Sequence, residues 1–239
     1  MNSNQLKSLF YFFFLMVLTG SCASNEIGES RDVNQETIYQ QYRVEYDEND
    51  KKASLFAQFR FAGEKGTTLI LSDPSKLEFN TAVVKVDSSD FSGAFYRLEF
   101  PREKVMGRHT LVYTDLNQKK YENTFSIDSF YLLDVPATIS KKAPALIRFK
   151  APALQQDDYI ELDSEGTDSS FSVKKTSANP GEYITIPVAE LQRQTKSEIW
   201  VVPTLYRTTR LQQQTKEGGE IITRQTLRPV QLKLVDETL

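Results

Sequence analysis

The sequence predicts an all-β protein built from two tandem β-sandwich domains. From Ile38 onward, short runs of alternating apolar and polar residues are separated by clusters of Gly, Pro, Asn and Asp, a pattern typical of strands joined by tight turns. No stretch shows convincing helical periodicity. A diverged repeat also links the two halves of the chain with a spacing of 88 residues, from Phe61 to Phe149, which is close to the length of one sandwich domain.

The first 21 residues have the pattern of a cleavable signal peptide. Lys7 precedes an apolar run of ten residues, from Leu9 to Leu18, whereas a membrane-spanning helix needs about 20. The run is followed by Thr19-Gly20-Ser21-Cys22, and Cys22 is the only cysteine in the chain. A lone thiol at this place predicts a covalent attachment point.

This segment resembles the lipobox of bacterial lipoproteins, in which the cysteine is acylated and becomes the mature N-terminus. Thr19 stands where the usual pattern has Leu, and Leu18 comes one place earlier, which is similar to lipoproteins of Bacteroidota. The resemblance implies a membrane anchor of acyl chains on Cys22, with an uncleaved anchor or a plain secretory signal as the alternatives. Because Ala23 follows rather than the Asp that retains some lipoproteins in the inner membrane, we expect the outer membrane, on its periplasmic or surface side.

The composition of the rest of the chain bears on its partners, its disulfides and its first residues. Without residues 1–21 the chain has 28 basic and 32 acidic residues, so nothing favours a nucleic-acid partner. After acylation no cysteine remains for a disulfide. Residues 22–37, which begin with the acylated cysteine, carry few large apolar side chains and many Asn, Ser, Glu and Gln residues, as expected of a flexible tether.

The strands follow in order from Ile38. The alternating runs include Tyr96, Leu98 and Phe100, then Tyr121, Phe125 and Ile127, each predicting a strand with one buried face. The predicted turns are 47–50, 63–66, 72–74, 179–181 and 217–219. The loop 63–68 has the residue types of a phosphate-binding loop but not its spacing, so we interpret it as a hairpin.

The repeat places the domain boundary. Phe59-Arg60-Phe61 corresponds to Ile147-Arg148-Phe149, and Gly93 corresponds to Gly181. Each half then has a strand that ends in proline, an apolar residue four positions later and another apolar strand. We therefore predict one sandwich over 38–129 and a second over 130–239, with a hinge near 128–136.

The run from Val105 to Asp115 resembles the Gly-x-Tyr-x-x-x-x-x-Asp strand of bacterial immunoglobulin-like modules, with His109 where such modules commonly have tyrosine. The resemblance implies Ig-like domains. Since His109 is the only histidine in the chain, a multi-histidine metal site is excluded, and catalysis would depend on a single imidazole. We interpret His109 as a corner residue that hydrogen-bonds the backbone.

Three sets of polar and aromatic residues are candidate sites. Asp163, Glu165 and Asp168 form the acidic segment best suited to Ca²⁺, with a solvated turn as the alternative. Arg207, Arg210, Arg224 and Arg228, together with Lys216, form the densest basic cluster; this cluster predicts either a site for an acidic partner or a solvated sheet face. Alternation places Arg224 and Arg228 on one face. Tyr42, Tyr46, Tyr159, Tyr183 and Tyr206 are the candidate sugar-stacking residues, half-buried packing being the alternative.

No catalytic motif or cofactor-binding motif is recognisable in the sequence. We therefore predict a lipid-anchored envelope protein that acts as a non-catalytic interaction or structural subunit, with a protein partner. A surface carbohydrate-binding lipoprotein is the alternative, and an enzyme is the third class.

Overall fold

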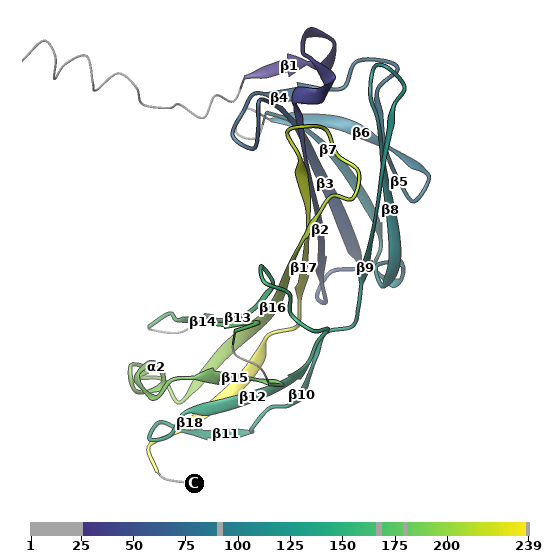
Figure 1. Cartoon of the computed structure of the whole chain (residues 1–239). Coiled ribbons are helices and arrows are strands. Elements are labelled where there is room, and N and C mark those ends of the chain that lie inside the picture. The colour runs from purple at the N-terminus through teal and green to yellow at the C-terminus, as the bar shows by residue number, and fades with distance from the viewer. Residues whose placement is uncertain (1–25, 90–92, 166–168, 179–180, 238–239) are drawn as a thin grey trace, which may run out of the picture.

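The computed structural model describes residues 26–89, 93–165, 169–178 and 181–237. The described chain forms two β-sandwiches, drawn at the upper and lower ends of Figure 1. The predicted signal peptide and Cys22 lie outside the described residues. Within the described ranges, none of the helices is both long enough and apolar enough to cross a membrane.

The first sandwich has the strand order of an immunoglobulin domain. Its strands are β2 (Ile38–Asp47), β3 (Lys52–Phe61), β4 (Thr68–Ile70), β5 (Lys76–Phe79), β6 (Ala82–Ser89), β7 (Gly93–Pro101), β8 (Gly107–Thr114) and β9 (Lys120–Ile127). One layer has the order β2-β3-β7-β6 and the other β5-β8-β9, which correspond to the ABED and CFG sheets. Aromatic side chains dominate the core between them, with Tyr42, Phe59 and Tyr113 fully buried.

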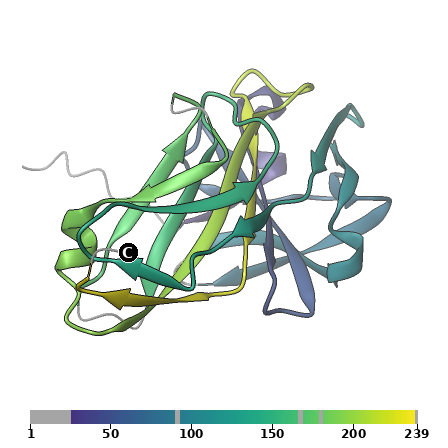
Figure 2. The ribbon, with the colours of Figure 1, turned by 90° about the horizontal axis from the view of Figure 1, so that it is seen from below.

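The second sandwich has its own core. Its strands are β10 (Tyr131–Asp134), β11 (Thr138–Ser140), β12 (Ala145–Lys150), β13 (Tyr159–Glu165), β14 (Ser172–Thr176), β15 (Tyr183–Ile186), β16 (Glu198–Arg210), β17 (Gly219–Thr226) and β18 (Val230–Val235), with the short helix α2 (Val188–Gln192). A three-stranded sheet, β10-β12-β15, packs against the larger sheet that contains β13, β16 and β18. Figure 2 shows these two layers from below. Strand β11 pairs in parallel with β18.

The repeated segments of the sequence form equivalent elements in the two sandwiches. Phe59 lies on β3 and Ile147 on β12, and both are fully buried. Pro101 is followed by the 3₁₀ turn η3 (Arg102–Lys104), and Pro187 by α2. After each proline the apolar residue four positions on, Val105 or Leu191, is buried. Each sandwich therefore has the same kind of corner, which leads into β8 in the first sandwich and into β16 in the second.

The hairpin β16–β17 connects the two sandwiches. Strand β17 pairs with β16 on one side and in parallel with β2 on the other, through eight register pairs from Gly219–Gln40 to Thr226–Asp47. Leu211 and Ile221 belong to the core of the first sandwich. The second core begins with Phe130, next to the predicted boundary at 129/130, but the chain returns to the first sandwich at 211–226.

The loop of this hairpin also contacts β9, the edge strand of the other layer of the first sandwich. The side-chain oxygens of Gln213 and Gln212 accept hydrogen bonds from the backbone N–H groups of Glu122 and Thr124, at 3.0 and 2.8 Å. The amide of Gln212 donates to the carbonyl of Thr124 at 2.8 Å. These amides satisfy backbone groups of β9 that a neighbouring strand would otherwise pair.

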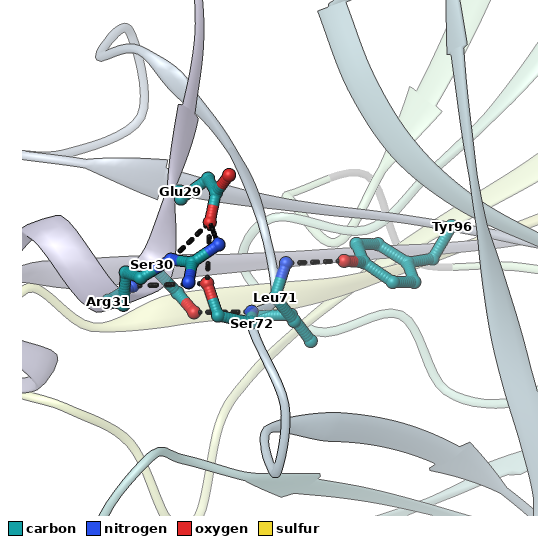
Figure 3. Close-up of polar contacts among 6 residues, drawn as sticks. All are labelled: Glu29, Ser30, Arg31, Leu71, Ser72 and Tyr96. Carbon is teal, nitrogen blue, oxygen red and sulfur yellow. Dashed lines mark hydrogen bonds and ion pairs between the residues drawn. The ribbon is translucent and has the colours of Figure 1, made fainter.

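Folded structure begins at Ile27 rather than at Ile38. Strand β1 (Ile27–Glu29) pairs in parallel with β4, and the turns η1 (Ser30–Asp32) and η2 (Gln35–Thr37) follow. Figure 3 shows how this segment is held: the N–H of Ser72 donates to the hydroxyl of Ser30 at 2.8 Å, and the hydroxyl of Ser72 contacts Glu29. A flexible tether is therefore wrong for residues 27–37 of the predicted 22–37, because short polar side chains bind backbone here.

Candidate interaction surfaces

The outer face of the three-stranded sheet exposes a group of large apolar side chains. Tyr131 and Leu133 on β10, Leu146 on β12 and Tyr183 on β15 are each 45–48% exposed. Ten large apolar side chains of the described residues are at least 40% exposed, and these four share one face, so the group is more than scattered surface residues. We call this group, with Arg148 and Lys150, the small-sheet face.

Strand register and a bulge create this face. Tyr131 lies opposite Lys150, and Arg148 lies opposite Tyr183. Alternation along β10 exposes both Tyr131 and Leu133. The register shifts between Leu132 and Asp134, so that Asp134 rather than Leu133 lies opposite Arg148. Lys150 pairs with Glu182 at 2.8 Å, and this contact raises the pKa of Lys150. The face therefore combines apolar, aromatic and cationic groups.

A second group of side chains crosses the outer face of the larger sheet. Lys174 lies over the ring of Tyr159 at 4.4 Å, the rings of Tyr159 and Tyr206 stack at 4.6 Å, and Arg224 lies 5.7 Å from the Tyr206 ring. The next strands continue this arrangement with Arg43 over Phe56 and Phe56 stacked on Phe95. We call this set the cation–aromatic row.

The charged and aromatic side chains of the cation–aromatic row already have partners on the same surface. Lys174 pairs with Glu161 at 3.3 Å, and this contact raises its pKa. Glu45 lies 3.1 Å from Arg43 and 4.0 Å from Arg224. Strand order places Tyr159, Tyr206 and Phe56 each between two partners, so their ring faces are covered and do not form an open platform for a sugar ring.

The structure separates the four arginines of the predicted basic cluster. Arg224 belongs to the cation–aromatic row, and Arg210 is exposed opposite Glu220. Arg228 follows the end of β17, so it does not share a strand face with Arg224 as the alternation predicts. Its backbone N–H donates to Glu48. These positions do not form one basic site.

Arg207 faces the opposite side of the hairpin and links the two sandwiches. Its Nε atom lies 3.0 Å from Oδ2 of Asp158, whose side chain is 1% exposed, and its guanidinium is 3.8 Å from Asp128. Oδ1 of Asp158 accepts the N–H of Thr208. The amide of Gln225 donates to the carbonyl of Asp128. Arg207 is therefore a structural residue at the junction, and it contacts Asp128 in the segment where the sequence predicts a hinge.

The predicted calcium segment is mostly strand. Asp163 and Glu165 lie on β13, opposite Val202 and Trp200 of β16, and Asp168 falls outside the described residues. The described ranges contain no group of three His, Cys, Asp or Glu side chains placed to hold a metal ion.

His109 is buried and bound to the backbone, as the sequence predicts. Its Nε2 atom lies 2.7 Å from the carbonyl oxygen of Val105, and Nδ1 lies 2.9 Å from the amide nitrogen of Asn80. The Asn80 oxygen accepts the N–H of Thr110, which orients the amide so that its nitrogen donates to Nδ1. Nε2 is then the protonated nitrogen and donates to Val105.

The remaining candidate tyrosines are dispersed. Tyr42 is fully buried in the first core. Tyr46 lines a shallow pocket of about 440 Å³ with Arg102, Glu48 and Arg228. Tyr183 belongs to the small-sheet face. Sequence reasoning misses the other apolar members of that face, because 130–136 looks like a hinge. The alternation of Ala145, Ile147 and Phe149 with Leu146 is the signal that could have identified Leu146 as outward-facing.

Comparisons with known proteins leave the family open. No protein-family model matches the chain, and no curated protein matches it. Among solved structures, DIP-gamma IG1+IG2 is similar with 10% identity and a TM-score of 0.22, covering 82% of this chain and 94% of that one. Murine CEACAM1b has 10% identity and a TM-score of 0.25, covering 82% and 100%. Bacteroides ovatus SGBP-B, in complex with a mixed-linkage heptasaccharide, has 9% identity and a TM-score of 0.24, covering 77% and 53%. The Ig-like assignment rests on the strand order described above.

Proposed function

We propose that this chain is a lipid-anchored, non-catalytic binding protein of the cell envelope, that Cys22 carries the lipid, and that the small-sheet face docks a protein partner. The observation that carries the proposed docking site is the clustering of four side chains, each 45–48% exposed, on one flat sheet. Tyrosine and arginine are enriched among the residues that dominate binding at protein interfaces. Tyr131, Tyr183 and Arg148 supply them here.

Charge and shape define the expected partner. Lys150 is already paired with Glu182, and Arg148 lies opposite Tyr183 and Asp134, so the partner should present an apolar surface with polar groups that complement Arg148 and Asp134. The carbohydrate alternative receives less support, because the faces of Tyr159, Tyr206 and Phe56 are covered and Tyr42 is buried. An outer-membrane location would place the docking surface in the periplasm or outside the cell.

Photocrosslinking of the lipidated full-length chain in its own membranes tests this function. A benzoylphenylalanine at Leu146 should yield a discrete protein adduct, while the same probe at Val83, which is 56% exposed on β6, should not. Leu146→Asp should abolish co-purification of the adduct's protein, and Val83→Asp should leave it intact. Equal crosslinking at both positions, or an adduct that is polysaccharide, would contradict a protein partner at this face.

A further inference from the structure

The described part of the chain begins close to the proposed lipid attachment site. Glu26 is the first described residue, and its carbonyl accepts a hydrogen bond from the hydroxyl of Thr68 at 3.1 Å. The chain from Cys22 to Glu26 can span at most about 14 Å, and the headgroup layer of a bilayer is itself about 5–8 Å thick. Acyl chains on Cys22 would therefore hold Glu26 within about 10 Å of the bilayer surface.

This attachment point lies at the end of the first sandwich that is far from the second sandwich, where Figure 1 shows β1 and β4. Ile27 begins β1 and is 45% exposed, and Phe61 ends β3 and is 40% exposed. Ile27 lies opposite Thr68, which lies opposite Arg60, the neighbour of Phe61. Exposed apolar side chains thus occur at the end of the molecule that the lipid would hold near the membrane, where they can enter the interfacial layer.

The charges at this end are balanced. Lys65 in the β3–β4 loop and Lys216 in the β16–β17 loop are both exposed, and each is next to an exposed glutamate. The β16–β17 loop lies at this end because the hydroxyl of Thr215 donates to the carbonyl of Ile38. Attraction to anionic lipids needs a cluster of basic residues, so contact with the bilayer should depend on apolar groups.

A continuous sheet separates this end from the second sandwich. Strand β17 pairs with β2 of the first sandwich and with β16, which continues into the second core. The stretch of β16 from Arg210 to Val201, a residue of that core, is about 30 Å long. The ion pair of Arg207 with the buried Asp158 holds the junction. The second sandwich is therefore not joined to the first by a single free linker.

We propose that the first sandwich stands on the bilayer through Ile27 and Phe61 and that the sheet holds the small-sheet face roughly 30 Å or more from the lipid headgroups. This proposal rests on the lipid anchor and the docking site of the proposed function. It adds the kind of partner: a folded domain in water at that height, rather than a segment embedded in lipid.

Fluorescence quenching by lipids that carry a nitroxide on the headgroup tests this arrangement. Cys22 is the only cysteine of the chain, and acylation removes its thiol, so Phe61→Cys and Leu146→Cys each give the lipidated protein one site for a bimane label. In phosphatidylcholine vesicles the label at 61 should lose most of its emission, whereas the label at 146 should keep nearly all of it. Equal quenching at the two positions would overturn the proposal.

A second pair of variants checks that the result does not depend on the first two positions. Lys65→Cys and Lys233→Cys replace exposed lysines at opposite ends of the molecule and should show the same difference. Phosphatidylglycerol in the vesicles should leave the quenching at 61 unchanged, because the charges there are balanced. Quenching at 61 that requires phosphatidylglycerol would overturn the apolar contact.

Flotation of the vesicles separates the two ways in which the proposal can fail. A wild-type chain that does not float with the vesicles would refute the lipid anchor and, with it, this arrangement. A chain that floats but is quenched equally at 61 and 146 would refute the arrangement alone and leave the anchor in place.

Discussion

Ile221 of β17 lies opposite Tyr42 of β2 in the parallel strand pair, and both residues are 0% exposed. A residue that lies between two strands of the second sandwich in sequence, β16 and β18, is therefore part of the core of the first. The stability of residues 38–127 should depend on the hairpin, although the hairpin is distant in the chain.

Ile221→Ala should reduce the free energy of unfolding by about 2–5 kcal/mol, because it removes buried methyl groups and leaves a cavity. Ile222→Ala, at the partly exposed neighbouring position, should cost less. Hydrogen exchange checks this expectation: Ile221→Ala should lower the protection of amides in β2 and β3. Unchanged protection there would show that the hairpin does not support the first sandwich.

Replacement of His109 should affect stability rather than binding. His109→Ala removes a hydrogen bond to the Val105 carbonyl and packing against Phe79 and Phe125, and it should cost about 1–3 kcal/mol. His109→Tyr should be tolerated better, since a hydroxyl can also bond backbone at this corner. Urea denaturation measures both effects. A His109→Tyr variant with the wild-type melting temperature but no binding function would point to a chemical role instead.

Arg207 and Arg210, which are three residues apart on β16, should respond differently to substitution. Arg207→Gln leaves the buried Asp158 without its cation and should cost about 1–3 kcal/mol. Arg210→Gln, at an exposed position, should change stability little. Thermal denaturation of both variants gives the comparison. Equal effects would contradict a specific role of Arg207 at the junction.

Two neighbouring lysines on β14, Lys175 and Lys174, should give different pH dependences of stability. Burial lowers the pKa of Lys175 below 10.5, so between the two pKa values the unfolded chain binds more protons, and stability should rise with pH in that window. The free energy of unfolding of wild type minus that of Lys175→Met should therefore increase with pH between the lowered pKa of Lys175 and about 10.5.

Lys174 provides the matched control, because the contact with Glu161 raises its pKa above 10.5. Its contribution is fully present below 10.5 and is lost as pH rises through the raised value. The difference between wild type and Lys174→Met should therefore stay constant over the same range. Parallel curves for both variants would contradict the assignment of Lys175 to a buried site.

Lipid attachment should depend on Cys22. Cys22→Ser removes the thiol that acyl transfer requires, so the variant should be released from membranes or retain its signal peptide. Incorporation of labelled palmitate into wild type and variant provides the measurement. Equal labelling of the two proteins would remove the basis for the proposed anchor.

Local patterns in the sequence predict much of the fold. The alternation of Tyr121, Phe125 and Ile127 correctly identifies the buried face of β9, because period-two burial is a property of a single strand. The pairing of β17 with β2 has no such signal, since it joins positions 179 residues apart, as between Gln41 and Glu220. The interaction surface is similarly hidden: the sequence indicates a hinge over 128–136, whereas Tyr131 and Leu133 lie on β10, a short strand whose pairing depends on β12.

The pairing of β17 with β2 also has a consequence for folding during synthesis. The edge of β2 stays unpaired until residues 219–226 have been made, 179 positions after those they contact. At about 5–20 residues per second this interval is roughly 10–40 s. During this time a nascent chain exposes a ten-residue strand with a free edge, which is a template for aggregation. A chaperone that shields this strand during synthesis would therefore increase the yield of folded protein.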